Sequence, residues 1–221
     1  MCSVAVFLRL SVPEEVTDYV GNGLMLPAYR YSLLFALIGC GIMLSGEQRP
    51  IALVGNLAVL AATLWFALQW AEPIILPFRA LAELIVRYPV VASAMGMGAG
   101  IALLFPLQTR RWLTPFVCAI SGFCLGLFII LESPFDYYYY WFSTAGGLSG
   151  MAVIIVSIAL ANGARQLVAG ATFAIAERIF GSWLIAASLL LTALTVMPQR
   201  SAEPAPRETT IINGMELPVL P

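Results

Sequence analysis

The feature that most constrains this chain is a series of long apolar stretches, each close to the ~20 residues that a helix needs to cross a bilayer. Apolar residues make up 61% of the 221 residues and charged residues only 10%, whereas soluble domains carry about 25% charged residues. The sequence therefore excludes a water-soluble globular fold. It predicts an all-α, polytopic bundle of transmembrane helices with six spans. The predicted spans are Leu26–Ser45, Pro50–Trp70, Tyr88–Gln108, Trp112–Leu131, Tyr138–Ala161 and Ile179–Met197.

These spans divide the chain into three parts. Residues 1–25 form an N-terminal segment outside the cytoplasm, residues 26–197 form the transmembrane domain, and residues 198–221 form a proline-rich tail. A tail of this composition cannot bury enough apolar surface to fold alone. Its last stretch, Ile211–Leu220, is apolar enough to dock on a neighbouring protein.

One connecting segment has the pattern of a short amphipathic helix. In Pro77–Tyr88, the charged residues Arg79, Glu83 and Arg87 are spaced four apart and share one helix face. Such a segment is typical of a helix that lies in the membrane interface. We expect a connector there, with a gate or lid as the alternative.

The stretch from Arg165 to Met197 allows two interpretations, one long helix or two shorter elements. Glu177 and Arg178 are adjacent, so on a helix they point about 100° apart and do not neutralise each other cleanly. Burying both in the bilayer would cost several kcal/mol. We therefore expect a break at or just before Gly181, with Ala164–Arg178 lying on the membrane surface.

The arginines in the loops predict the orientation, because cytoplasmic loops carry an excess of positive charge. The turn at Glu132–Asp136, on the opposite side, carries only acids, although Arg79 and Arg87 depart from the rule. Both termini are accordingly predicted to lie outside the cytoplasm, in the inner (plasma) membrane of a bacterial-type cell. The arginines assigned to the cytoplasmic side are Arg49, Arg110, Arg111, Arg165 and Arg178.

Composition also excludes several kinds of chemistry. The chain has no Lys and no His, so it cannot form a Schiff base, a histidine-ligated metal site or a histidine-activated nucleophile. The net charge of −1 offers no basic footprint for nucleic acid. We expect no enzyme activity, no catalytic residue and no cofactor. The cysteines have no C-x-x-C spacing and are expected to fill apolar space; they are Cys2, Cys40, Cys118 and Cys124.

Three polar residues are the candidates for ligand binding. Glu132 and Asp136 fall on one short turn, so both carboxylates could reach a common cation. The alternative is that this turn is simply solvated. Asn56 is a polar residue inside the second span. Which metal would bind is left open.

Small residues recur every four positions in three consecutive predicted spans. In lipid, such faces allow helix backbones to approach closely. The sequence therefore predicts that the third, fourth and fifth spans pack tightly, either against each other or against another subunit. The residues are Ala92, Gly96 and Gly100, then Gly122 and Gly126, and then Gly146 and Gly150.

The order and spacing of these features resemble the HupE/UreJ family of six-helix membrane permeases. Four stretches carry the resemblance: Tyr31–Gly46, Glu83 with Ser93 and Gly96, Gly122 and Gly126 followed by Glu132-Ser133-Pro134, and the run that begins at Arg178. It implies a six-helix fold and uptake of nickel or cobalt. The family's proposed ligands are histidines, which this chain lacks, so Glu132 is the one matching ligand position.

Two functions from different classes follow as expectations. The first is a permease-like protein for a divalent metal ion or small solute, with Glu132, Asp136 and Asn56 at its site. The second is a non-catalytic accessory subunit of a larger membrane complex. Its partners would be the lipid bilayer and other subunits, contacted through the small-residue faces or the tail.

Overall fold

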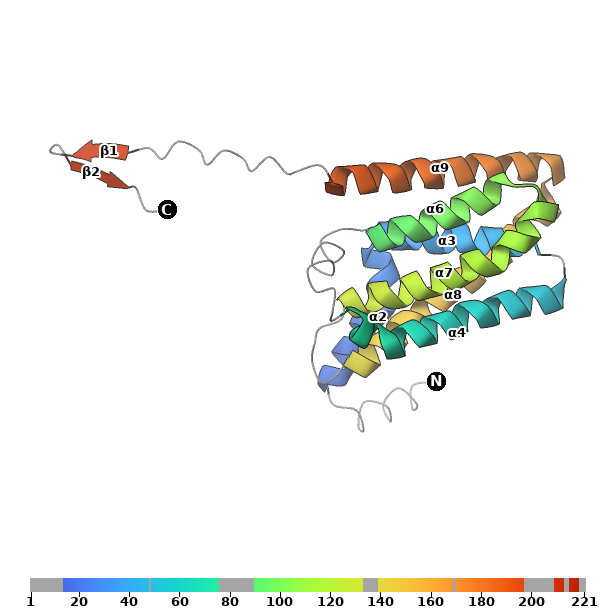
Figure 1. Ribbon diagram of the computed structural model, residues 1–221, viewed down its shortest axis with the longest axis horizontal. Coiled ribbons are helices and arrows are strands. Elements are labelled where there is room, and N and C mark those ends of the chain that lie inside the picture. The colour runs from blue at the N-terminus through green and yellow to red at the C-terminus, as the bar shows by residue number, and fades with distance from the viewer. Residues whose placement is uncertain are drawn as a thin grey trace.

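The computed structural model describes residues 14–47, 49–75, 90–132, 139–168, 170–196, 209–212 and 215–218. Within these residues the chain forms seven helices and two short strands (Figure 1). The helices are α2 (Glu14–Tyr29), α3 (Tyr31–Ser45), α4 (Pro50–Ile75), α6 (Val90–Leu104), α7 (Leu107–Glu132), α8 (Tyr139–Leu167) and α9 (Gly170–Val196).

Length and composition qualify four of these helices as candidate membrane spans, namely α4, α7, α8 and α9. Helices α2 and α3 qualify only together, as one span that is bent by 76° at Arg30. Counting this pair raises the number of candidate spans to five. Helix α6 is apolar but shorter. The expectation of an apolar helical bundle is confirmed, while the count of six spans stays a prediction.

Helix α3 lies inside the bundle, where it contacts α6 on one side and α8 on the other. Helix α4 packs along α7, α6 packs along α9, and α2 crosses α8. From α3 to α9 the helices alternate in direction, so α4, α7 and α9 begin at the same end (Figure 1). That end also holds the last turns of α3, α6 and α8, and we call it the arginine end.

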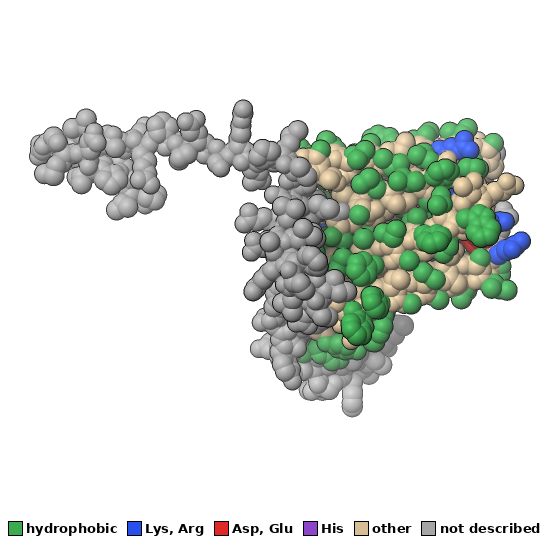
Figure 2. All heavy atoms as spheres, in the orientation of Figure 1, with side chains coloured by type: hydrophobic (Ala, Val, Ile, Leu, Met, Phe, Trp, Pro, Cys, Tyr) green, Lys and Arg blue, Asp and Glu red, His purple; other side chains and the backbone are tan. Residues whose placement is uncertain are grey.

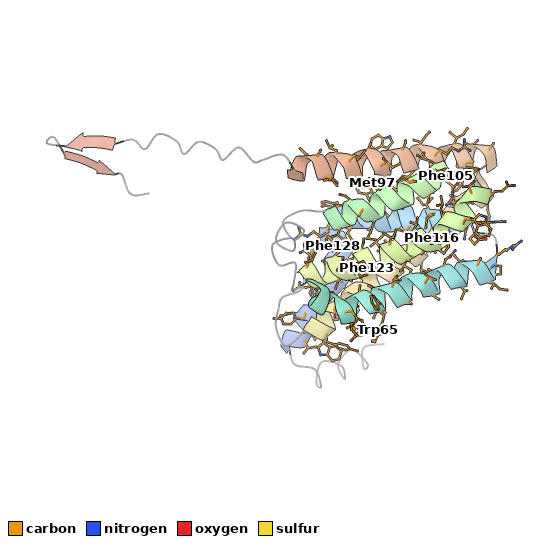
Figure 3. All side chains as sticks on the ribbon, in the orientation of Figure 1. Trp65, Met97, Phe105, Phe116, Phe123 and Phe128 are labelled. Carbon is orange, nitrogen blue, oxygen red and sulfur yellow. The ribbon has the colours of Figure 1, made fainter. Side chains whose placement is uncertain are left out.

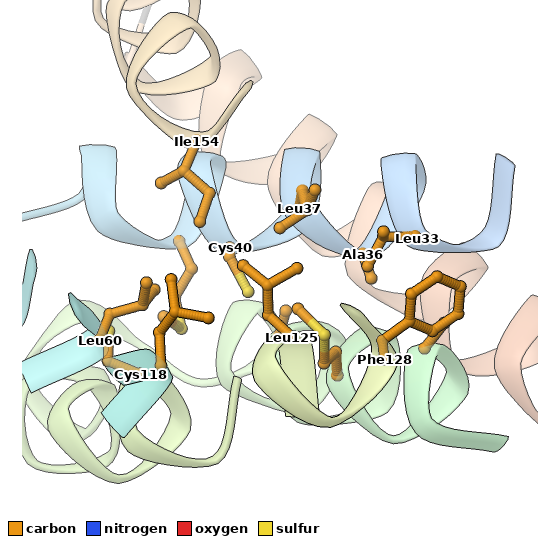
Figure 4. Close-up of a cluster of buried hydrophobic side chains, with 14 of the residues drawn as sticks. Leu33, Ala36, Leu37, Cys40, Leu60, Cys118, Leu125, Phe128 and Ile154 are labelled. Carbon is orange, nitrogen blue, oxygen red and sulfur yellow. The ribbon is translucent and has the colours of Figure 1, made fainter. Parts of the chain in front are cut away.

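Apolar side chains fill the space around α3. Leu33, Leu37 and Cys40 are fully buried, and Leu125 from α7 and Ile154 from α8 meet them (Figure 4). The thiol of Cys40 donates a hydrogen bond to Ser121 Oγ at 3.3 Å. Leucine, isoleucine and cysteine side chains pack densely, so apolar contacts dominate this core between the two ends of the bundle.

Close backbone approach explains where α6 and α9 cross. A Cβ atom on Gly100 would lie 2.7 Å from the carbonyl oxygen of Gly181, and one on Gly181 would lie 2.9 Å from that of Gly100. Real Cβ atoms do not come this near, so both positions need glycine.

The predicted break at Gly181 is wrong. Helix α8 continues to Leu167, and α9 then runs without interruption from Gly170 to Val196. The surface segment predicted at Ala164–Arg178 is therefore wrong as well, since its two halves belong to two long helices. The physical reason is that Glu177 does not rely on Arg178 for its counter-charge, as shown below.

Other boundaries also differ from expectation. The predicted first span Leu26–Ser45 is interrupted at Arg30, and α2 extends across the expected domain boundary at residue 25. Helix α7 begins at Leu107, five residues before the predicted Trp112, and so includes Arg110. The expected amphipathic connector Pro77–Tyr88 lies outside the described residues.

The C-terminal tail contains two strands that the sequence did not lead us to expect. Strand β1 (Thr209–Ile212) pairs antiparallel with β2 (Met215–Pro218), with Thr209 opposite Pro218 and Ile212 opposite Met215. In the sequence, Asn213 and Gly214 separate the two strands. The tail thus has local structure, although a lone hairpin has only marginal stability.

Candidate functional site

Charged side chains gather at the two ends of the bundle. In the space-filling view, arginine side chains cluster at the arginine end, beyond the apolar surface of the helices (Figure 2). Arg110, Arg165 and Glu177 meet there, and Glu47 lies near Arg111. At the opposite end, Arg30 pairs with Glu132.

Glu177 bridges two arginines from different helices. Its Oε2 atom lies 3.4 Å from Nη1 of Arg110, and its Oε1 atom accepts a hydrogen bond from Nη2 of Arg165. Arg110 is 3% exposed and Glu177 is 9% exposed. Arg165 also lies over the ring of Phe173, 4.9 Å from its centroid. A carboxylate with two guanidinium partners has its charge compensated inside the protein.

The same two arginines cap the C-terminus of α3. Arg110 donates to the carbonyl oxygen of Ile42 at 2.9 Å and to that of Met43, and Arg165 donates to that of Ser45. The last carbonyls of a helix have no partner within the helix and carry partial negative charge. The two guanidinium groups donate hydrogen bonds to these carbonyls and also compensate their partial negative charge. The cluster therefore links α3 to α7, α8 and α9.

A groove opens beside this cluster, between the first turns of α4 and α7. Arg49, Asn56, Gln108 and Arg111 line it, and its volume is about 540 Å³. Glu47 also faces it, with Oε1 3.7 Å from Nε of Arg111. The sequence-predicted residue Asn56 therefore lies at the arginine end.

A second pocket lies at the opposite end, at the bend between α2 and α3. It holds Arg30 and Glu132, whose side chains meet at 2.7 Å, and Tyr19, Asn22 and Phe142 surround them. Its volume is about 450 Å³. Both charged side chains are partly exposed to solvent, 53% for Arg30 and 27% for Glu132.

The three predicted binding residues do not form one site. Glu132 ends α7, whereas Asn56 lines the groove near the beginning of that helix, towards the opposite end of the bundle. Asp136 lies outside the described residues, so its approach to Glu132 stays a prediction. Among the residues that the structure describes, no group of three acidic or cysteine side chains is placed to hold a metal ion.

The predicted packing glycines lie at helix contacts: those of α6 and α7 meet α9 and α4, and those of α8 meet α7. Gly96 and Gly100 face Ser188 and Gly181 of α9, and Gly126 faces Ala67 of α4. Gly122 also contacts α4, at Leu60 and Thr63, and Ala92 is buried. Gly146 and Gly150 of α8 both face α7, a helix of the expected set. A Cβ atom on Gly150 would lie 2.9 Å from Leu125, and one on Gly146 would lie 3.4 Å from Ile129 and 3.5 Å from Leu26 of α2.

Sequence reasoning missed the cluster of Arg110, Arg165 and Glu177. It treated Glu177 as half of a pair with Arg178, yet Arg178 is exposed and Glu177 is buried. The available signal was that Glu177 is the one acid in an otherwise apolar run, and a charge inside a membrane segment requires a partner. Two loop arginines on the same predicted side were available to supply it.

Comparisons of the chain with models of known protein families, with curated proteins and with solved structures find no match. The apolar helices are those of a protein embedded in a membrane.

Proposed function

We propose that this chain is a six-span protein of the inner membrane with both termini outside the cytoplasm. In this proposal α2 and α3 together make the first crossing and α6 makes the third. The alternating directions of the helices support it, as does the gathering of Arg49, Arg111 and Arg178 at one end. The positive-inside rule then assigns the arginine end to the cytoplasm.

Its function, in this proposal, is that of a non-catalytic accessory subunit that packs against another membrane protein. The observation that carries it is the outward face of α4. Gly55, Ala58 and Ala62 lie on that face and are exposed, and nothing lies within 4 Å of a Cβ built on Gly55. Trp65 lies on the same outer side of the helix (Figure 3).

Small residues at this spacing are the interfaces that membrane helices use to approach one another. Glycine also costs about 1 kcal/mol relative to alanine inside a helix. Within the chain, close contact with α4 offsets this cost for the glycines of α7. Gly55 has no such contact among the described residues, so a helix from another chain is the partner that fits this face.

Gentle detergent extraction tests this function. The wild-type protein is expected in a particle heavier than 23.8 kDa plus its micelle, together with another chain. The double variant Ala58→Leu with Ala62→Leu is expected to elute alone, because the larger side chains keep the backbones apart. Ala186→Leu, an exposed alanine on α9, is the matched control and should keep the complex. A wild-type protein that elutes alone contradicts the proposal.

A permease for a small solute is the second candidate, and the pocket at the bend between α2 and α3 favours it. Interrupted membrane helices are where many transporters bind substrate. Arg30 and Glu132 supply one charge of each sign in that pocket, which suits a small zwitterionic or polar solute. For a divalent metal ion, Glu132 would first have to leave Arg30.

Uptake of radioactive nickel or cobalt ions into proteoliposomes tests the metal version of this second candidate. Wild-type uptake that is lost in Glu132→Gln and kept in Arg178→Gln would support it. Absence of uptake by the wild-type protein would remove the metal ion as a substrate. The same pair of variants applies to any amino-acid solute that the wild-type protein is found to transport.

A further inference from the structure

We propose that the groove between the first turns of α4 and α7 binds the headgroup of an anionic phospholipid. It goes beyond both proposed functions. The groove shares Gly55 with the outward face of α4, whereas Ala58, Ala62 and the pocket at Glu132 take no part in it. The groove lies at the arginine end, where helix ends reach the headgroup layer of a bilayer.

The electrostatics of the groove favour an anion. Arg49 and Arg111 line it, and Glu47 offsets one of their two charges. Helices α4 and α7 both begin at this point, at Pro50 and Leu107. The free N–H groups of a helix N-terminus attract negative charge, and here two N-termini converge on one groove.

Asn56 is the observation that marks a built site. Its side chain is 9% exposed and lines the groove, about 9 Å along α4 from Pro50 at ~1.5 Å per residue. Among the described residues its amide has no hydrogen-bond partner. The side chain is largely buried but its amide is open to the groove, so a ligand oxygen there would accept a hydrogen bond from Asn56.

The shape of the groove favours a lipid over a free anion. The wall of the groove also includes the apolar or small residues Ala52, Gly55 and Pro115. Trp112 stands at the edge and is 80% exposed, as is typical of tryptophan at the membrane interface. A phosphate at the two arginines would leave the rest of the lipid to contact Asn56 and the apolar residues of the groove. Basic pockets between membrane helices bind acidic headgroups in this way.

Native mass spectrometry of the purified full chain in detergent tests the proposal, with dioleoylphosphatidylglycerol and dioleoylphosphatidylcholine as probes. The wild-type protein should retain the anionic lipid preferentially. Arg111→Gln should weaken that binding about fivefold, because one arginine near a lipid surface changes the binding constant by about that factor. Asn56→Leu should weaken it as well while leaving the arginines in place.

Arg178→Gln is the matched control, because Arg178 is exposed at the same end but lies outside the groove. It should retain the anionic lipid as the wild type does. Equal retention of both lipids, or an equal loss in Arg178→Gln and Arg111→Gln, overturns the proposal. Displacement of the lipid by millimolar inorganic phosphate at constant ionic strength would assign the groove to a soluble anion and also overturn it. Far-ultraviolet circular dichroism verifies that each variant is folded.

Discussion

At the scale of single residues, burial separates the two ion-pair sites of this chain. The carboxylate of Glu177 is enclosed with two arginines, whereas Glu132 and Arg30 share their charges with solvent. Removing one partner of a buried ion pair leaves an uncompensated charge and costs far more than removing one partner of an exposed pair.

Glu177→Gln should therefore destabilise the protein by about 3–5 kcal/mol, the range for breaking a buried pair. The substitution leaves Arg110 and Arg165 close together without a carboxylate between them. Thermal unfolding in mild detergent measures the effect, and Arg178→Gln at the neighbouring exposed position should leave the melting temperature nearly unchanged. An equal effect of both variants would contradict the bridging role of Glu177.

Arg30→Gln should cost no more than about 1 kcal/mol, because its pair with Glu132 is partly solvated. The contribution of this pair should fall as salt is raised, since screening acts mainly on exposed charges. Unfolding of the wild type and the variant at low and high ionic strength checks both points. A loss of stability as large as that caused by Glu177→Gln would show that the Arg30–Glu132 pair is shielded from solvent.

At the scale of secondary-structure elements, small residues decide which helices pair. The four-residue spacing of glycines was visible in the sequence, but it does not name the partner helix. Gly96 and Gly100 meet α9, where Gly181 and Ser188 provide an equally small surface. Sequence reasoning placed a helix break at or just before Gly181 and did not include Gly181 among the packing residues.

Gly100→Ala should destabilise the protein by about 1–3 kcal/mol, the usual cost of overpacking. The added methyl group would meet the backbone oxygen of Gly181 at 2.7 Å, and a backbone atom cannot turn aside as a side chain can. Gly163→Ala is the control, because nothing lies within 4 Å of a Cβ there. It should be neutral or slightly stabilising, and thermal unfolding compares the two.

At the scale of the whole molecule, the apolar stretches were enough to predict a helical membrane bundle. They did not predict the bend at Arg30. Hydropathy reports whether a segment is apolar, and it does not report which side chains from distant segments meet. The cluster of Arg110, Arg165 and Glu177 joins residues up to 67 positions apart. The local sequence pattern therefore gives little information about it.

The orientation of the bundle can be tested by cysteine labelling in intact cells. Asp18 and Arg178 are both exposed. They lie towards opposite ends of the bundle, because Asp18 is in α2, before the bend at Arg30, and Arg178 is in the first turns of α9, which begins at the arginine end. In a background with the four native cysteines replaced by alanine, Asp18→Cys should react with a membrane-impermeant maleimide. Arg178→Cys should react only after the cells are permeabilised. The reverse pattern would place the arginine end outside the cytoplasm, against the positive-inside rule, and would move the lipid groove to the other leaflet.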